Sequence, residues 1–287
     1  AAWLLFATVS RYFENAKLAA ALAFLFFPSV VFWSSGLVKE TLALAGIFWM
    51  STIFLRFLKG DKISLLQFII GLLALWLAWN LKYYWAALFL VVAVTSVIVH
   101  FLQAFTLAKS FGWLIIWSVL FVAICIIASQ VHPNFYFSRF LQVIVSNHDA
   151  FVQISKPEGL IHFYKLDAAW WSMVMNSPWA LVSGLFRPWL GEASGFTGLM
   201  AAFENLFLLV LLLSNFFRKS WRTNQELLLT AILVYVALLC VLLALSTPNL
   251  GTLSRYRVGF LPFFVFVIAY GNPLIEKIRQ STWHRHK

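Results

Sequence analysis

Long apolar stretches separated by short polar connectors make up most of this 287-residue chain. About 17–25 apolar residues in a row are enough for an α-helix to cross the hydrocarbon layer of a bilayer. The alternation predicts nine spanning helices, at roughly 1–10, 18–35, 41–58, 63–79, 85–102, 111–130, 198–217, 227–246 and 259–275. Pro28 lies inside the second of these and is expected to kink it. We therefore predict an all-α, polytopic transmembrane fold.

Residues 131–197 interrupt this pattern, because they are too polar and too broken to form a single span. They divide the chain into an N-terminal transmembrane block (1–130), an outer loop (131–197), and a C-terminal transmembrane block with a cytoplasmic tail (198–287). The loop contains Trp170, Trp171, Trp179 and Trp189. The mixture of apolar and polar residues from Ile161 to Met175 predicts an interfacial helix that could cover an outer site as a lid.

The composition supports a membrane protein. Hydrophobic residues make up 62% of the chain and charged residues 11%, whereas soluble domains average about 25% charged residues. Such a sequence is neither a soluble globule nor a disordered chain. Cys125 and Cys240 both lie in apolar runs, where small core residues are expected.

The formal net charge of +11 gives the predicted orientation. Cytoplasmic loops of membrane proteins collect Lys and Arg. If the C-terminal tail is cytoplasmic, 13 basic residues fall on that side and eight on the other, four of them in the long loop. We expect a bacterial inner-membrane protein with a cytoplasmic tail and a periplasmic active face. The cytoplasmic set is Arg11, Lys17, Arg56, Lys59, Lys62, Lys109, Arg218, Lys219, Arg222, Lys277, Arg279, Arg285 and Lys287.

The chain opens at Ala1 within an apolar run, and no basic segment or cleavage site precedes that run. It therefore does not resemble a signal peptide, and we expect further sequence upstream.

The first candidate site residues on the outer face are Lys39 and Glu40, at the start of a span. A lysine suits a phosphate, and a glutamate suits a sugar hydroxyl or a proton transfer. The alternative is structural, with Ser34 and Ser35 capping the following helix and Glu40 favoured in its first turn.

Asn80, Lys82 and Tyr83 form a second outer group. Lys82 could pair with a lipid phosphate and Asn80 could bind a sugar hydroxyl. The alternative for these residues and their aromatic neighbours is an ordinary interfacial belt.

Two further outer groups complete the candidate substrate-binding set. Arg187 and Glu192 precede Glu204, which lies within a predicted span. A charged side chain inside a membrane is costly and suggests a function. The alternative is that a basic residue on another span pairs with Glu204 structurally. Arg255, Tyr256 and Arg257 lie at the mouth of the last span, where the planar guanidinium suits phosphate oxygens unless the arginines only anchor head groups.

No cofactor is evident from the sequence. His132, His148 and His162 lack close metal-ligand spacing, although a divalent metal remains compatible with the chain. The nucleotide-binding and nucleophile-elbow motifs are absent, and no nucleic-acid partner is expected.

This layout resembles the GT-C superfamily of integral membrane glycosyltransferases, more narrowly the family 39-like protein mannosyltransferase and lipid A aminoarabinose transferase type. The matching features are the basic turn from Arg11 to Lys17, Pro28, the serine-rich segment before Lys39-Glu40, and Arg255-Tyr256-Arg257 before Pro262. The resemblance covers most of the chain in layout, through short motifs.

The resemblance implies sugar transfer from a polyprenyl-phosphate donor to a glycan, lipid or protein acceptor outside the cytoplasm. Arg255, Arg257 and Lys39 would bind the donor phosphate. The family's general base would lie in a first outer loop upstream of Ala1, which leaves Glu40 as the best catalytic carboxylate within this chain. The alternatives are a transporter or flippase of a lipid-linked sugar and a non-catalytic membrane subunit.

Overall fold

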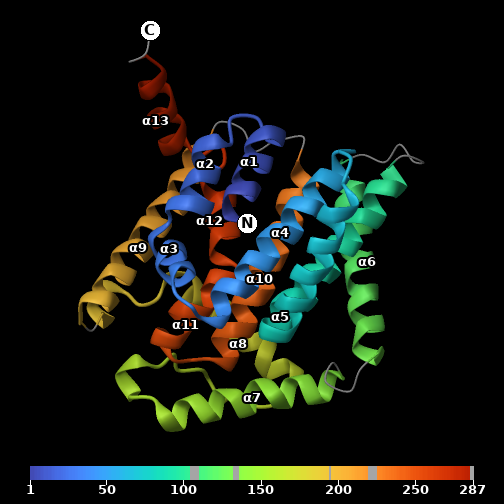
Figure 1. The fold of residues 1–287 in the computed structure, drawn as a ribbon. Helices are drawn as coiled ribbons and strands as arrows, with labels where there is room; N and C mark the ends of the chain where they lie inside the picture. Colours follow the sequence, from blue (N-terminus) through green and yellow to red (C-terminus); the bar gives the residue numbers. More distant parts are fainter. Residues whose placement is uncertain (104–109, 132–135, 194, 219–224, 285–287) are drawn as a thin grey trace.

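A computed structural model describes residues 1–103, 110–131, 136–193, 195–218 and 225–284. Lys109, Lys219, Arg222, Arg285 and Lys287, which were used to predict the orientation, lie outside these residues, as does His132. The described residues form helices joined by short connections, together with one isolated antiparallel bridge between Leu160 and Asn249. Figure 1 shows most of these helices running roughly side by side.

The elements follow one another along the chain. They are α1 Ala2–Tyr12, α2 Lys17–Ala21, the π-helical η1 Leu22–Phe26, α3 Pro28–Ser35, α4 Lys39–Leu58, α5 Leu65–Gln103, α6 Ser110–Val131, α7 Phe137–Ile154, η3 Pro157–Gly159, α8 Trp170–Phe186, η4 Leu190–Glu192, α9 Gly195–Ser214, η5 Asn215–Phe217, α10 Glu226–Ser246, α11 Leu250–Tyr256, η6 Arg257–Gly259, α12 Leu261–Ala269 and α13 Pro273–His284.

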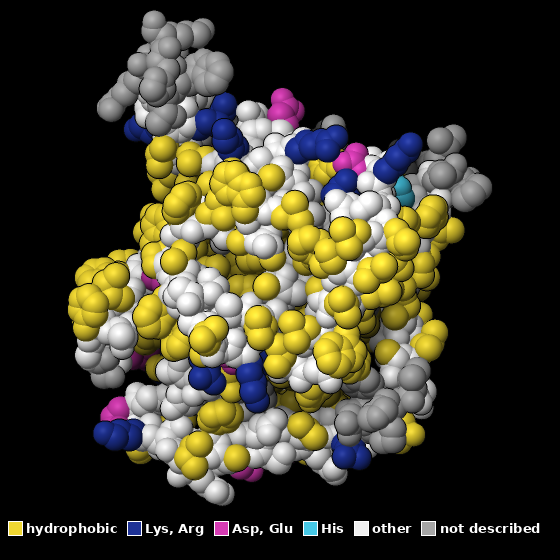
Figure 2. All heavy atoms as spheres, in the orientation of Figure 1, with side chains coloured by type: hydrophobic (Ala, Val, Ile, Leu, Met, Phe, Trp, Pro, Cys, Tyr) yellow, Lys and Arg dark blue, Asp and Glu magenta, His cyan; other side chains and the backbone are white. Residues whose placement is uncertain are grey.

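Among the described residues, five helices are long and apolar enough to cross a membrane, or seven if two bent pairs each count as one span. The chain is therefore a helical membrane protein. Figure 2 shows hydrophobic side chains around the middle of the visible face, with Lys and Arg gathered toward its upper and lower margins. The core combines residues from α1 to α13, so both predicted transmembrane blocks contribute to it.

Helix α5 counts once in this tally, although it consists of two arms that meet at Lys82, whose backbone is not helical (φ −146°, ψ 68°). Both arms pack on α4. A Cβ on Gly71 would meet the side chain of Ile53, while the rings of Phe89 and Phe54 lie 6.4 Å apart. Residues 71 and 89 would be about 27 Å apart in a straight helix, so the chain must turn back at Lys82. The predicted break between residues 79 and 85 is thus present as a sharp turn.

The predicted kink at Pro28 is confirmed. The segments Lys17–Phe26 and Pro28–Ser35 meet at 41°, with Pro28 in the first turn of α3. Proline lacks the N–H that would continue the preceding helix and is tolerated in a first turn.

The predicted helix over 161–175 is wrong in its first part, since α8 begins only at Trp170. The side chain of Asn176 holds the preceding segment in a bent, non-helical path: it accepts from the Tyr164 N–H at 2.9 Å and donates to the Tyr164 carbonyl at 3.0 Å. The more amphipathic helix of the loop is α7, which buries Leu141 and Ile144 and runs across one end of the molecule (Figure 1).

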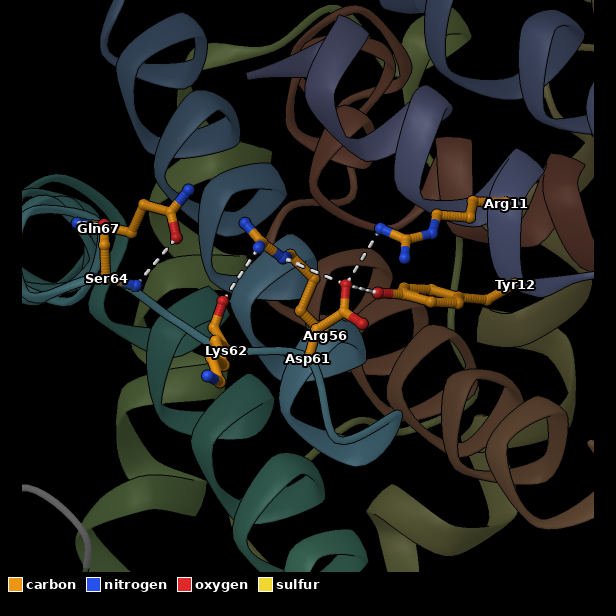
Figure 3. A network of polar contacts seen from close by, with 7 residues as sticks. All are labelled: Arg11, Tyr12, Arg56, Asp61, Lys62, Ser64 and Gln67. Carbon is orange, nitrogen blue, oxygen red and sulfur yellow. Dashed lines mark hydrogen bonds and ion pairs between the residues drawn. The ribbon is translucent and has the colours of Figure 1, made fainter.

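The predicted cytoplasmic loops meet at the opposite end. Arg11 bonds Asp61 at 3.1 Å, Lys59 bonds Gln225 at 3.2 Å, and Arg218 bonds the Tyr270 carbonyl at 3.1 Å. Figure 3 shows Arg11 and Arg56 approaching Asp61 from α1 and α4. The alternation of sides derived from the sequence therefore agrees with which connections lie together.

Candidate functional site

The candidate site centres on Glu40, in the first turn of α4, whose side chain is almost fully buried. Its Oε1 atom lies 2.7 Å from Lys82 Nζ and 3.5 Å from Arg255 Nε. Three segments that are distant in sequence thus meet at one carboxylate. We call Glu40, Lys82, Arg255 and Tyr256 the Glu40 cluster.

Lys82 is buried because it lies at the turn of α5, where the chain points it back into the protein. Its Nζ lies 3.6 Å from the ring centroid of Tyr256, and the rings of Tyr84 and Trp85 are about 6 Å away. An ammonium over an aromatic face is attracted by the ring quadrupole. The aromatic residues around Lys82 are therefore more than an interfacial belt.

Trp85 reaches this position only because Gly259 lies against it. A Cβ at Gly259 would come within 2.4 Å of the Trp85 ring. Trp85 is fully buried, and its ring centroid lies 6.0 Å from Lys82 Nζ.

The Glu40 cluster has more positive than negative charge. Lys82 and Arg255 share one carboxylate, and the neighbouring Lys39 is exposed. Arg255 is the more accessible of the two cations, since 36% of its side chain is exposed, whereas its Nε is buried, faces Glu40 and makes no hydrogen bond to the described residues. Buried charges need compensation, so this cluster suits an anion.

A second buried group surrounds Glu204 on α9. The Glu204 carboxylate accepts from the Ser29 hydroxyl and from the Ser29 N–H, at 3.2 Å, in the first turn of α3. Arg257 is 1% exposed, donates to Asn205 Oδ1 at 2.7 Å and interacts electrostatically with Glu204. We call Ser29, Glu204, Asn205 and Arg257 the Glu204 cluster.

The two arginines predicted to bind the donor phosphate together point to different clusters. Arg255 turns toward α4, whereas Arg257 turns toward α9 and is closed off from the surface. Arg257 Nε and Nη2 are buried without hydrogen-bond partners among the described residues. Arg257 attracts Glu204 electrostatically, but among the described residues its hydrogen bond goes to Asn205 and not to the carboxylate, so direct pairing of Glu204 with a basic residue of another span stays a prediction.

The remaining predicted residues belong to neither cluster, although Asn205 of the Glu204 cluster donates to the carbonyl of Pro188, next to Arg187, at 3.1 Å. Arg187 forms a two-point ion pair with Glu192, with N–O distances of 2.9 and 2.7 Å. Asn80 donates to the Trp76 carbonyl of its own helix at 2.7 Å, and Tyr83 is exposed. Ser34 and Ser35 do not cap α4, because their hydroxyls donate back to Val31 and Phe32 carbonyls, at 3.4 and 2.9 Å.

Outside the span helices, the pKa of the Glu192 carboxyl lies below its usual range. Partial burial acts to raise it, but hydrogen bonds from Arg187 and from the Trp189 N–H, together with the Arg187 charge, outweigh that effect. The pair is therefore ionised at neutral pH and fixes the connection between α8 and α9.

Sequence reasoning missed Ser29 and Gly259. Ser29 follows a helix-breaking proline, so it had a local signal. Gly259 had none, because its role is to make room for a residue 174 positions away.

In the part of the chain that the structure describes, no group of three or more His, Cys, Asp or Glu side chains could hold a metal ion. Comparison with known protein families, with curated proteins and with solved structures found no match.

Proposed function

We propose that this protein is a membrane glycosyltransferase that moves a sugar from a polyprenyl-phosphate-linked donor to a glycan, lipid or protein acceptor on the non-cytoplasmic face. The observation behind this proposal is the Glu40 cluster, in which two cations share one buried carboxylate at a helix end. A lipid-linked phosphate would supply the missing negative charge.

The chemistry of the cluster fits this substrate. When a sugar passes from a lipid phosphate to an acceptor hydroxyl, the bond from the anomeric carbon to the phosphate oxygen breaks and a bond from that carbon to the acceptor oxygen forms. Negative charge develops on the departing phosphate, which can take up the proton that the acceptor loses. Positioned cations in a low-dielectric site stabilise such charge. Arg255 presents a planar fork of donors to phosphate oxygens, while Lys82 and Lys39 act as point charges.

In this proposal Glu40 holds Lys82 and Arg255 in position. Its Oε1 atom already faces both cations, so its role as an acceptor of a substrate proton is the less favoured one. We assign no metal to the reaction, and donor phosphate binding rests on Arg255, Lys82 and Lys39.

The proposed topology has nine spans. They are α1, α4, the two arms of α5, α6, α9, α10, and the two bent pairs Lys17–Phe26 with Pro28–Ser35 and Leu250–Gly259 with Leu261–Ala269, each pair taken as one span. The end that contains Arg11 and Arg56 is cytoplasmic, and the Glu40 cluster faces the periplasm of a bacterial inner membrane. The basic residues at the first end support this orientation.

The test uses the purified protein in liposomes with polyprenyl phosphate bearing a radiolabelled sugar, and cell-envelope extract as the source of acceptor. We expect transfer of label by the parent and at least ten-fold slower transfer by Arg255→Gln and by Lys82→Met. The matched control is Lys156→Gln, an exposed lysine of the outer segment.

Unchanged transfer in both site variants would contradict the proposal. Movement of the intact labelled lipid across the bilayer without a covalent product would instead establish the transporter alternative. If neither occurs unless a second protein is supplied, the chain is the accessory subunit.

A further inference from the structure

An apolar cavity lies between the helices at the end of the molecule opposite the Glu40 cluster. The cavity itself has a volume of about 60 Å³, and the empty space grows to about 610 Å³ when the region open to the surroundings is included. The cavity is lined by residues of α1, η1, α4, the second arm of α5, α10 and α12. It extends from Leu228, near the start of α10, to Phe89, seven residues after the turn of α5 at Lys82.

Water is a poor occupant of this cavity. Among the described residues that line it, only Ser51 and Tyr235 have polar side-chain atoms. Both are engaged, because Ser51 donates to the Ile47 carbonyl at 2.8 Å and Tyr235 to the Gly259 carbonyl at 3.1 Å. An internal water needs about two to four polar partners. In a bilayer the available filler is hydrocarbon.

Basic side chains occur at the same ends of α1 and α4 as two of the residues that line the cavity. Val9 and Leu55 line the cavity, and Arg11 and Arg56 lie within two residues of them on α1 and α4. Figure 3 shows these two guanidinium groups and Tyr12 converging on the single carboxylate of Asp61. Lys59 follows α4 directly and is exposed.

Positive charge exceeds negative charge over this whole end. Its described residues include eight basic side chains and four acidic ones. The basic set is Arg11, Lys17, Arg56, Lys59, Lys62, Arg218, Lys277 and Arg279, and the acidic set is Glu14, Asp61, Glu226 and Glu276. Basic pockets between transmembrane helices are suited to anionic lipid head groups.

We propose that this cavity binds one acyl chain of an anionic glycerophospholipid, whose phosphate lies at Arg11, Arg56 and Lys59. The site is separate from the Glu40 cluster. Tyr235, on the cavity wall, bonds Gly259, and Gly259 packs against the fully buried Trp85 beside Lys82. This packed layer lies between the two sites, which favours a phospholipid over the chain of a polyprenyl phosphate bound at the Glu40 cluster.

The experiment measures lipid retention by native mass spectrometry of the full chain in detergent. The probes are phosphatidylglycerol, phosphatidylcholine with the same chains, and undecaprenyl phosphate. We expect one retained phosphatidylglycerol, with affinity at least ten-fold above that of phosphatidylcholine. Arg11→Gln and Lys59→Gln should each weaken it about five-fold, and Ala231→Trp should abolish chain entry because Ala231 lines the cavity.

Two matched controls should leave retention unchanged. Lys156→Gln removes an exposed charge at the opposite end, and Val119→Trp enlarges a side chain that is 63% exposed on α6. A phosphatidylglycerol with a diazirine near the chain terminus needs no substitution, and should crosslink to Phe89 or Val92 in the unaltered protein.

Equal retention of the two phospholipids, or crosslinks only to exposed residues of α6, would overturn the proposal. Retention of undecaprenyl phosphate alone, lost in Ala231→Trp, would also overturn it by assigning the cavity to a prenyl chain. None of these results depends on sugar transfer, so this site and the proposed activity fail separately.

Discussion

At the scale of single residues, Glu40 is the buried charge on which its neighbours depend. Glu40→Gln leaves Lys82 and Arg255 without an anion in a poorly solvated place. Breaking a buried ion pair from one side costs about 3–5 kcal/mol. We expect a loss near the lower figure, about 3 kcal/mol, because Arg255 is partly exposed and can turn to solvent. Unfolding of the purified protein in detergent measures it.

The double variant Glu40→Gln with Lys82→Met separates pairing from packing. It removes both charges and keeps similar volumes, so it should be more stable than Glu40→Gln alone. A double variant as unstable as the sum of the two single variants would mean that Glu40 and Lys82 do not interact.

The Arg187–Glu192 pair gives a pH dependence. Because the pKa of Glu192 is lower in the folded protein than in the unfolded chain, the pair stabilises the fold above the ordinary carboxyl pKa of about 4.3. That contribution is lost as the pH falls through the lowered pKa. We expect Glu192→Gln to be less stable than the parent by about 1 kcal/mol at pH 7.

The same comparison at low pH is the check. Once the pH is below the lowered pKa of Glu192, the two proteins should converge in stability, while the exposed Glu158→Gln should match the parent at pH 7 and at low pH. A gap between Glu192→Gln and the parent that is independent of pH would show that the carboxylate charge is not what stabilises this connection.

The chemistry of these residues could be predicted from the sequence, but their pairing could not. Glu40, Lys82 and Arg255 stand out as charges at helix ends in an apolar chain. Which cation meets which carboxylate depends on the turn at Lys82 and on the direction of each side chain. Arg255 and Arg257 are two residues apart and still face different helices.

At the scale of elements, close approach between helices depends on small residues. Gly259→Ala would place a methyl group about 2.4 Å from the Trp85 ring, which forms the layer between the Glu40 cluster and the apolar cavity. Overpacking of this kind costs about 1–3 kcal/mol. Thermal unfolding should show that loss, whereas Gly159→Ala, with nothing within 4 Å of its added Cβ, should be neutral.

The connection before α8 depends on one buried side chain. Asn176→Ala would leave the Tyr164 N–H and carbonyl without their partner, so the non-helical segment before α8 should loosen. We expect about ten-fold faster hydrogen exchange over residues 162–168, measured by mass spectrometry, and no change in the exposed Asn147→Ala. Unaltered exchange in Asn176→Ala would show that other contacts hold the segment.

This connection also shows why the sequence predicted the helix wrongly. Apolar and polar residues alternate over 161–169 much as they do in an amphipathic helix. What prevents a helix here is the Asn176 side chain, which takes the hydrogen bonds of the Tyr164 backbone twelve residues earlier. A contact between residues so far apart leaves no pattern in the local sequence.

At the scale of the whole molecule, hydropathy and loop charge predicted more than the local motifs did. The apolar segments, the kink at Pro28 and the grouping of connections at two ends all appear in the structure. The reason is that a bilayer imposes helix length and alternation on every segment alike. Side-chain pairing within the bundle follows no such rule.

The two ends give a final prediction, that Lys62→Cys and Lys156→Cys lie on opposite sides of the membrane. Both lysines are exposed, and they lie near Asp61 and near α7 respectively. The native Cys240 is fully buried and Cys125 lies within α6, so a membrane-impermeant maleimide should not reach either.

In intact spheroplasts we expect labelling of Lys156→Cys alone, and of Lys62→Cys only after permeabilisation. The reverse pattern would invert the proposed orientation and move the Glu40 cluster to the cytoplasmic face, where a periplasmic transferase is ruled out. Labelling of both from one side would contradict the fold itself, because the bundle separates these two positions by the length of its helices.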